Sequence, residues 1–144
     1  MTIDKATPAD APRLFEVWEA SVRATHDFLS EDAIATLVPL VRDLLGTFTP
    51  LYCLRDGTGA PHAFIGVAEG NIEMLFVHPD HRGAGAGRAL TEFAIGTLGA
   101  TKVDVNEQNG QAAGFYARMG FAQVARSERD PFGNPYPILH LALQ

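Results

Sequence analysis

The stretch RGAGAGRAL, residues 82–90, is the feature that most restricts how this chain folds and what it binds. It places glycine at 83, 85 and 87, directly before an apolar run. Without side chains, the backbone of such a stretch can turn sharply and come close to a ligand. The preceding EMLFV is typical of a strand, and the residues from Arg88 onward are typical of a helix. Because the first amides of a helix are unpaired and carry its positive dipole end, the loop predicts a phosphate site, with a ligand-free tight turn as the alternative.

The spacing within the loop separates three kinds of phosphate site. A P-loop needs Lys-Ser or Lys-Thr after its last glycine, and Arg-Ala follows here. A dinucleotide fingerprint needs Gly or Ala in its last position, which Arg88 or Leu90 occupies, although Asp104 could match its acidic residue. This loop also follows the fourth expected strand rather than the first. The pattern R-x-x-G-x-G fits residues 82–87, and it favours a pyrophosphate bound at the start of the helix.

Changes in the period of the apolar residues divide the chain into strands and helices. Strands are expected at 3–5, 50–59, 60–70, 71–79, 101–105, 121–128 and 136–143, and helices at 7–26, 30–45, 86–100 and 111–120. Thr7, Pro8 and Asp10 form a typical helix start, and Gly120 a typical helix end. The order β-α-α-β-β-β-α-β-α-β-β predicts an α/β fold, with a mixed, mostly antiparallel sheet of roughly six to seven strands and about four helices. No repeat or linker interrupts it, so one domain over residues 1–144 is expected.

Composition limits the kinds of binding partner and the cellular compartment that we expect for this protein. The net charge of −6 argues against nucleic acid, because proteins that bind it usually present a basic face. No apolar run reaches membrane-spanning length, and the first residues lack the pattern of a signal peptide. The single cysteine, Cys53, cannot form an intrachain disulfide and suits a reducing compartment. We therefore expect a cytoplasmic protein that binds neither membrane nor nucleic acid, and the spacing of His, Cys and carboxylate residues predicts no metal site.

Two motifs together resemble the acetyl-CoA-binding signature of the GNAT superfamily of N-acetyltransferases. They are VHPDHRGAGAGRAL and NGQAAGFYARMGF, with Asn109 and Tyr116 at the spacing of that family. The element order is similar along essentially the whole chain, and ATHDFLS, VNEQN and PYPILHL are similar to a bacterial subgroup of the YjaB type. The resemblance implies direct transfer of an acetyl group from acetyl-CoA to an amine of a small molecule or protein, by a monomer or homodimer. A degenerate member that binds coenzyme A as a sensor is the alternative.

The resemblance also assigns residues to acetyl-CoA. The strand EMLFV would contact the thioester and the pantetheine arm through its backbone, and the glycine loop that follows it would hold the pyrophosphate. Asn109 would cap its helix and bind the pantetheine arm. The residues implied to bind the cofactor are Leu75, Phe76, Val77, Arg82, Gly83, Ala84, Gly85, Ala86, Gly87, Arg88, Asn109 and Tyr116.

Tyr116 is the candidate general acid. The pKa of a phenol is ordinarily near 10 and that of a thiol near 8.5, so a phenol can supply a proton as charge develops on the departing sulfur. A half-buried aromatic residue that packs its helix on the sheet is the alternative role.

Glu73 is the candidate general base, because an ammonium group must lose a proton before it can attack a thioester. Its carboxylate lies within the otherwise apolar NIEMLFV, and strict alternation predicts that it points away from the face of Met74 and Phe76, into a cleft. Asp104 is the alternative candidate for the general base, and a water relay without a direct base is the third possibility. His26 and Asp27 of ATHDFLS and the loop RDPFGNPYP are expected near the acceptor.

Overall fold

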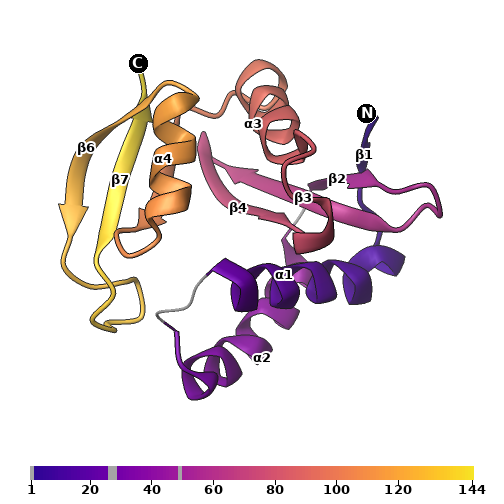
Figure 1. Cartoon of the computed structure of the whole chain (residues 1–144), viewed down its shortest axis with the longest axis horizontal. Helices are drawn as coiled ribbons and strands as arrows, with labels where there is room; N and C mark the ends of the chain where they lie inside the picture. Colours follow the sequence, from indigo (N-terminus) through magenta and orange to yellow (C-terminus); the bar gives the residue numbers. More distant parts are fainter. Residues whose placement is uncertain (1, 26–28, 49) are drawn as a thin grey trace.

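The structure, a computed structural model, describes residues 2–25, 29–48 and 50–144 (Figure 1). The strands are β1 (Ile3–Lys5), β2 (Leu51–Arg55), β3 (Pro61–Ala68), β4 (Asn71–Val77), β5 (Lys102–Asn106), β6 (Phe121–Ser127) and β7 (Ile138–Leu143). The α-helices are α1 (Ala11–Thr25), α2 (Glu31–Thr47), α3 (Ala86–Thr97) and α4 (Gly110–Arg118), with short 3-10 helices η1 (Pro8–Asp10) and η2 (Pro79–His81) before α1 and α3. The predicted order of strands and α-helices is confirmed.

All seven strands join one mixed sheet in the order β1-β2-β3-β4-β5-β7-β6. Neighbours are antiparallel except β4 and β5, which run parallel and pair only at Asn71 with Lys102 and Ile72 with Val103. Beyond that point β4 stays paired with β3 and β5 with β7, so the two central strands separate. Figure 1 shows the resulting halves, with β2, β3 and β4 on one side and α4, β6 and β7 on the other. The sheet is therefore split at its centre.

The two faces of the sheet are covered by different helices. In Figure 1, α3 and α1 lie on opposite sides of the β2–β4 half. Under α3 and α4, the core contains Leu54, Ala63, Ile65, Ile72, Leu90, Val103, Val105, Tyr116, Phe121 and Leu141. Under α1 and α2, it contains Leu14, Val17, Trp18, Val22, Ile34, Leu45, Leu51, Cys53, Phe64 and Met74. Burial of the apolar stripes on both sides is the main stabilising contribution to this fold.

Strand β4 carries an irregularity at Glu73. Gly66 pairs with Met74 but Val67 pairs with Ile72, so Glu73 has no partner on β3. An extra residue of this kind is a β-bulge, and it breaks the alternation of side chains along the strand. Ile72 consequently packs under α3 and α4, whereas Met74 packs under α1 and α2. Strict alternation, which the sequence reasoning assumed for Glu73, is therefore wrong here, because Ile72 and Met74 lie on opposite sides of the sheet.

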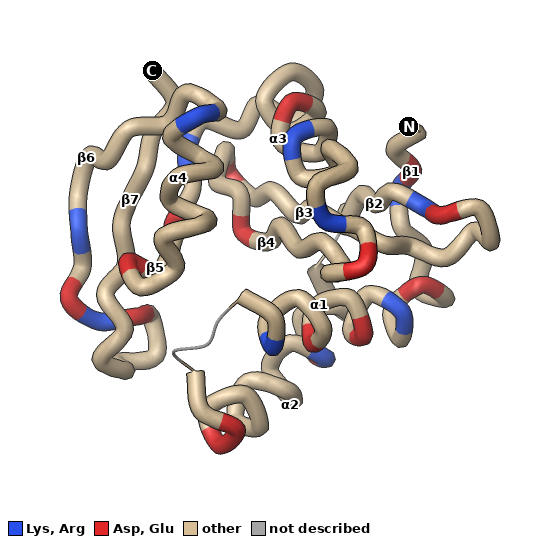
Figure 2. Tube along the Cα trace, viewed as in Figure 1, with Lys and Arg blue, Asp and Glu red and all other residues tan. Residues whose placement is uncertain are grey.

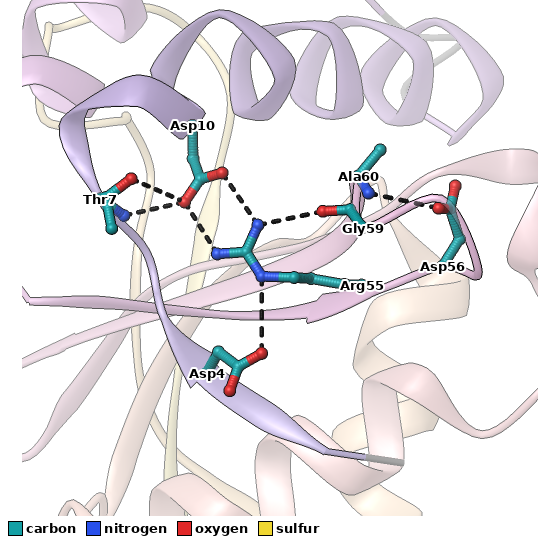
Figure 3. A network of polar contacts seen from close by, with 7 residues as sticks. All are labelled: Asp4, Thr7, Asp10, Arg55, Asp56, Gly59 and Ala60. Carbon is teal, nitrogen blue, oxygen red and sulfur yellow. Dashed lines mark hydrogen bonds and ion pairs between the residues drawn. The ribbon is translucent and has the colours of Figure 1, made fainter.

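The start of the first helical segment is tied to the β2–β3 hairpin (Figure 3). Thr7 and Asp10 form the predicted capping box, although the first turn is the 3-10 helix η1. Arg55 donates hydrogen bonds to both carboxylate oxygens of Asp10, at 2.9 Å each, and approaches Asp4 at 3.5 Å. The hydrogen bonds and charge of Arg55, together with the hydrogen bonds from Thr7, lower the pKa of Asp10 from 3.8 to about 2. Asp10 therefore serves both as a helix cap and as one half of an ion pair.

Candidate functional site

A cavity of about 430 Å³ opens where β4 separates from β5. It is lined by Ser21, Thr25, Leu75, Phe76, Val77, His81, Arg82, Gly83, Gly85, Ala86, Gly87, Arg88, Asn109, Gln111, Ala112, Phe115, Tyr116 and Arg118. Of the residues that the sequence assigns to the cofactor, only Ala84 is outside this lining, and it is exposed. Residues of α1, β4, the glycine loop, the start of α3 and α4 therefore meet around one space.

The glycine loop has the geometry of an anion-binding turn. Gly83 and Gly85 adopt φ angles of 77° and 86°, in the left-handed region that favours glycine. Gly85 is the N-cap of α3 and has no side chain to cap the helix. The Ala89 amide is the first in this helix to bond back, to the Gly85 carbonyl at 2.9 Å. The amides of residues 86–88 are thus the unpaired donors of the first turn, and they border the cavity.

Helix α4 adds residues that the sequence reasoning missed. Gln111, Phe115 and Arg118 follow one another at four- and three-residue spacing and line the cavity on one helix face. That spacing was the available signal. Arg118 forms no ion pair within the described ranges, whereas Arg88 pairs with Glu92 at 2.8 Å. Both arginines also line a neighbouring cavity of about 580 Å³ between α3 and α4, and Figure 2 shows basic positions in blue at the start of α3 and on α4.

Asn109 lies at the start of α4 and Tyr116 lies near its end, and both residues line the cavity. The Asn109 side chain accepts a hydrogen bond from the Ala112 amide at 3.1 Å, which confirms its predicted role as a helix cap. The ring of Tyr116 is buried between Phe115 and Phe121, with centroid distances of 5.0 and 5.6 Å. Burial raises the pKa of the Tyr116 phenol above its ordinary value. The phenol therefore keeps its proton and can act as a donor.

A second cavity, of about 390 Å³, lies near the split on the other face of the sheet. It is lined by Ala68, Glu69, Asn71, Glu73, Lys102, Asp104, Val124, His140, Leu141 and Ala142. The two candidate bases, Glu73 and Asp104, thus border the same space. Neither lines the cavity that contains Tyr116. Asp104 is bonded to His140, since its Oδ1 lies 2.7 Å from Nδ1 of the ring.

The segments expected near the acceptor are described only in part. His26 and Asp27 lie outside the described residues. The 129–137 loop packs against α2, and together they enclose a cavity of about 290 Å³ lined by Leu29, Ala33, Thr36, Leu37, Asn106, Asp130, Pro131, Phe132, Asn134, Tyr136 and Ile138. The Asp130 carboxylate orders this loop by accepting the amides of Phe132 and Asn134 at 3.0 and 2.8 Å.

Similarity to known proteins shows the family to which this fold and this site belong. The family model of the acetyltransferase (GNAT) domain matches residues 51–123. The chain belongs to the GNAT family, whose members use acetyl-CoA as acetyl donor, and it is an N-acetyltransferase. In the described part of the chain, no helix has the length and apolar character needed to cross a bilayer.

Its relatives define a narrower group. The peptidyl-lysine N-acetyltransferase YjaB of Escherichia coli strain K12 is 39% identical over 142 residues, covering 99% of this chain and 96% of the relative. The protein of the same description from Salmonella typhimurium strain LT2 is 40% identical and covers 98% and 97%.

Solved structures agree with this fold. The solution structure of apo YjaB from E. coli matches with a TM-score of 0.90 at 40% identity, covering 98% of this chain and 95% of that one. PaiA N-acetyltransferase from Thermoplasma acidophilum, solved in complex with coenzyme A, matches with a TM-score of 0.73 at 18% identity over 97% and 98% of the two chains. The expected mixed α/β fold of the GNAT type is confirmed.

Proposed function

We propose that this protein transfers the acetyl group of acetyl-CoA to the ε-amino group of a lysine side chain in a protein or peptide. The observation that carries the proposal is near full-length similarity to two proteins described as peptidyl-lysine N-acetyltransferases. Acetyl-CoA occupies the cavity between β4, α3 and α4. Residues 1–144 act as one domain in the cytoplasm, as a monomer or homodimer.

The first amides of α3 and the glycine loop bind the pyrophosphate. Their unpaired N–H groups and the positive end of the helix dipole attract a doubly charged group. Gly83 and Gly85 let it approach the backbone without a side chain in the way. Arg82, Arg88 and Arg118 border the same space and add positive charge.

The pantetheine arm lies along β4. From Glu73 onward this strand has no partner on the side of β5, so alternate backbone N–H and C=O groups of Leu75, Phe76 and Val77 are available to it. The arm thus replaces part of the missing strand pairing, as an extended peptide does when it adds to a sheet edge. Asn109 stands at the entrance to α4 and binds the arm from the opposite side.

Tyr116 acts as the acid. Its raised pKa means that complete proton transfer to a free thiolate is unfavourable, because the thiol is the stronger acid. The useful effect is a hydrogen bond to sulfur that strengthens as negative charge develops, and that stabilises the transition state more than the ground state. A proton of the attacking amine then reaches the thiolate sulfur as the tetrahedral intermediate collapses.

A binding protein that senses coenzyme A without turnover is the second candidate. The test is release of free thiol from acetyl-CoA in the presence of a peptide with a blocked N-terminus and one lysine. The matched control peptide carries acetyl-lysine at that position. Thiol release and a mass increase of one acetyl group with the first peptide alone support the proposal. Tight acetyl-CoA binding without thiol release, across a panel of amines, supports the sensor.

A further inference from the structure

Three polar side chains form a continuous hydrogen-bonded chain across the sheet. Asp104 of β5 lies 2.7 Å from Nδ1 of His140 on β7, and Nε2 of the same ring lies 2.7 Å from the hydroxyl of Ser127 on β6. His140 is thus bonded through both ring nitrogens, although about a third of its side chain remains exposed, at 34%. No other carboxylate that lines the second cavity has a comparable partner among the described residues.

This hydrogen-bonded chain lies on the face of the sheet opposite α3 and α4. Val103, Val105 and Leu141 are buried under α3 and α4, so the residues that alternate with them, Asp104 and His140, point to the opposite face. Tyr116 belongs to the core on the α3 and α4 side. Tyr116, the candidate acid, therefore lies on one face at the split between β4 and β5, and the hydrogen-bonded side chains of Asp104 and His140 lie on the other.

Asp104 stands directly at the split. The last residue of β5 that pairs with β4 is Val103, so Asp104 is the first position beyond the pairing. Its counterpart on β4 is the bulged Glu73, which borders the same cavity. The second carboxylate oxygen of Asp104, Oδ2, makes no hydrogen bond within the described part of the protein, and its side chain is 49% exposed. Oδ1 of Asp104 is thus held by His140, and Oδ2 is available to an incoming amine.

The hydrogen-bond roles follow from the chemistry of the groups. An ionised carboxylate only accepts, so Nδ1 of His140 carries the hydrogen. In the neutral ring Nε2 is then an acceptor, and it receives the hydroxyl hydrogen of Ser127. The ring is fixed at both ends in one tautomer, and it holds the carboxylate in one orientation. Glu73 is exposed, and no side chain among the described residues supports its carboxylate in this way.

We propose that Asp104 accepts the proton of the acceptor ammonium and that His140, held by Ser127, is the residue that positions it. The proposal rests on the proposed acetyl transfer. The ammonium N–H passes its proton to Oδ2 of Asp104, and the freed amine attacks the acetyl carbon to form the C–N bond. As the C–S bond breaks, the second amine proton passes to the thiolate sulfur with the help of Tyr116. The proton on Asp104 then leaves to water. Glu73 attracts the cationic acceptor by its charge.

Two substitutions of His140 separate positioning from mere packing. The amide nitrogen of asparagine coincides with Nδ1 of histidine, whereas that of glutamine coincides with Nε2. His140→Gln therefore loses the donor to Asp104, and we expect kcat to fall by about ten- to a hundredfold, as for other partners that orient a reactive group. His140→Asn keeps that donor and recovers most of the loss. The KM for acetyl-CoA stays unchanged in both, since its cavity does not include His140.

The tautomer of His140 supplies a test that needs no acceptor. We expect ¹⁵N NMR of the wild-type imidazole rings to report the Nδ1–H form for His140, and Asp104→Ala to shift it toward the Nε2–H form. An Nε2–H tautomer of His140 in the wild type that stays the same in Asp104→Ala overturns the proposal. So does equal kcat for wild type, His140→Gln and His140→Asn, all with unchanged circular dichroism. A wild type that fails to release thiol with any amine contradicts the proposed function instead.

Discussion

The link between Asp10 and Arg55 offers a stability prediction whose size follows from the structure. Both oxygens of Asp10 accept hydrogen bonds from Arg55, and Oδ2 also accepts the Thr7 amide at 2.8 Å (Figure 3). Asp10→Asn keeps an oxygen for the Thr7 amide but removes the charge. The substitution therefore separates the ion pair from the helix cap.

The lowered pKa of Asp10 sets the upper limit of the effect. At about 1.4 kcal/mol for each tenfold change in proton affinity, a pKa lowered from 3.8 to about 2 corresponds to roughly 2.5 kcal/mol. The side chains of Arg55 and Asp10 remain 26% and 13% exposed, and water weakens a partly exposed pair. We therefore expect Asp10→Asn to lower the free energy of unfolding at pH 7 by about 1–2 kcal/mol.

The sign of the pH dependence is fixed by the same pKa. Because Asp10 is more acidic in the folded than in the unfolded protein, its contribution is complete above pH 4 or so and is lost as the pH falls toward about 2. The assay is urea denaturation at pH 7 and pH 3 for wild type, Asp10→Asn, Arg55→Met and the double variant. A coupling energy of zero at pH 7, or one that is the same at pH 3, refutes the reasoning.

Three further predictions concern the site. Gly85→Ala puts a side chain at φ 86° and should weaken acetyl-CoA binding about tenfold or more by calorimetry, whereas Gly46→Ala, in open space on α2, should not. Asn109→Ala should lower the free energy of unfolding by about 1 kcal/mol through the lost cap, and Asn109→Asp should restore it in thermal melts. Glu73→Gln should raise the KM for a lysine peptide more than it lowers kcat; an effect on kcat alone would make Glu73 the base.

Local patterns explain why much of the fold could be predicted from the sequence. The capping box of Thr7 and Asp10, the glycines before α3 and the Asn109 cap each act within a few residues, so neighbouring sequence carries the signal. The glycine loop and α4 could be assigned to one site because each contains its own motif. Their meeting around one cavity agrees with that assignment.

Features that depend on pairing between distant strands could not be predicted. Strict alternation fails around Glu73, because the bulge arises from the register of β4 against β3. Likewise, Asp104, Ser127 and His140 lie on three strands, and nothing in their local sequence indicates that they are bonded. Arg118 was missed because it looks like an ordinary charged residue at the end of a helix.

The central claim is that Tyr116 assists the departure of the thiolate from acetyl-CoA bound in the split of the sheet. Tyr116→Phe keeps the ring that packs between Phe115 and Phe121, so folding and acetyl-CoA affinity should change little. The most direct measurement is steady-state thiol release by wild type and Tyr116→Phe with one competent acceptor, beside a calorimetric titration with acetyl-CoA. We predict that kcat falls by about two to four orders of magnitude while the Kd stays within about twofold. Full turnover in Tyr116→Phe, or weaker binding with unchanged turnover, would contradict the account.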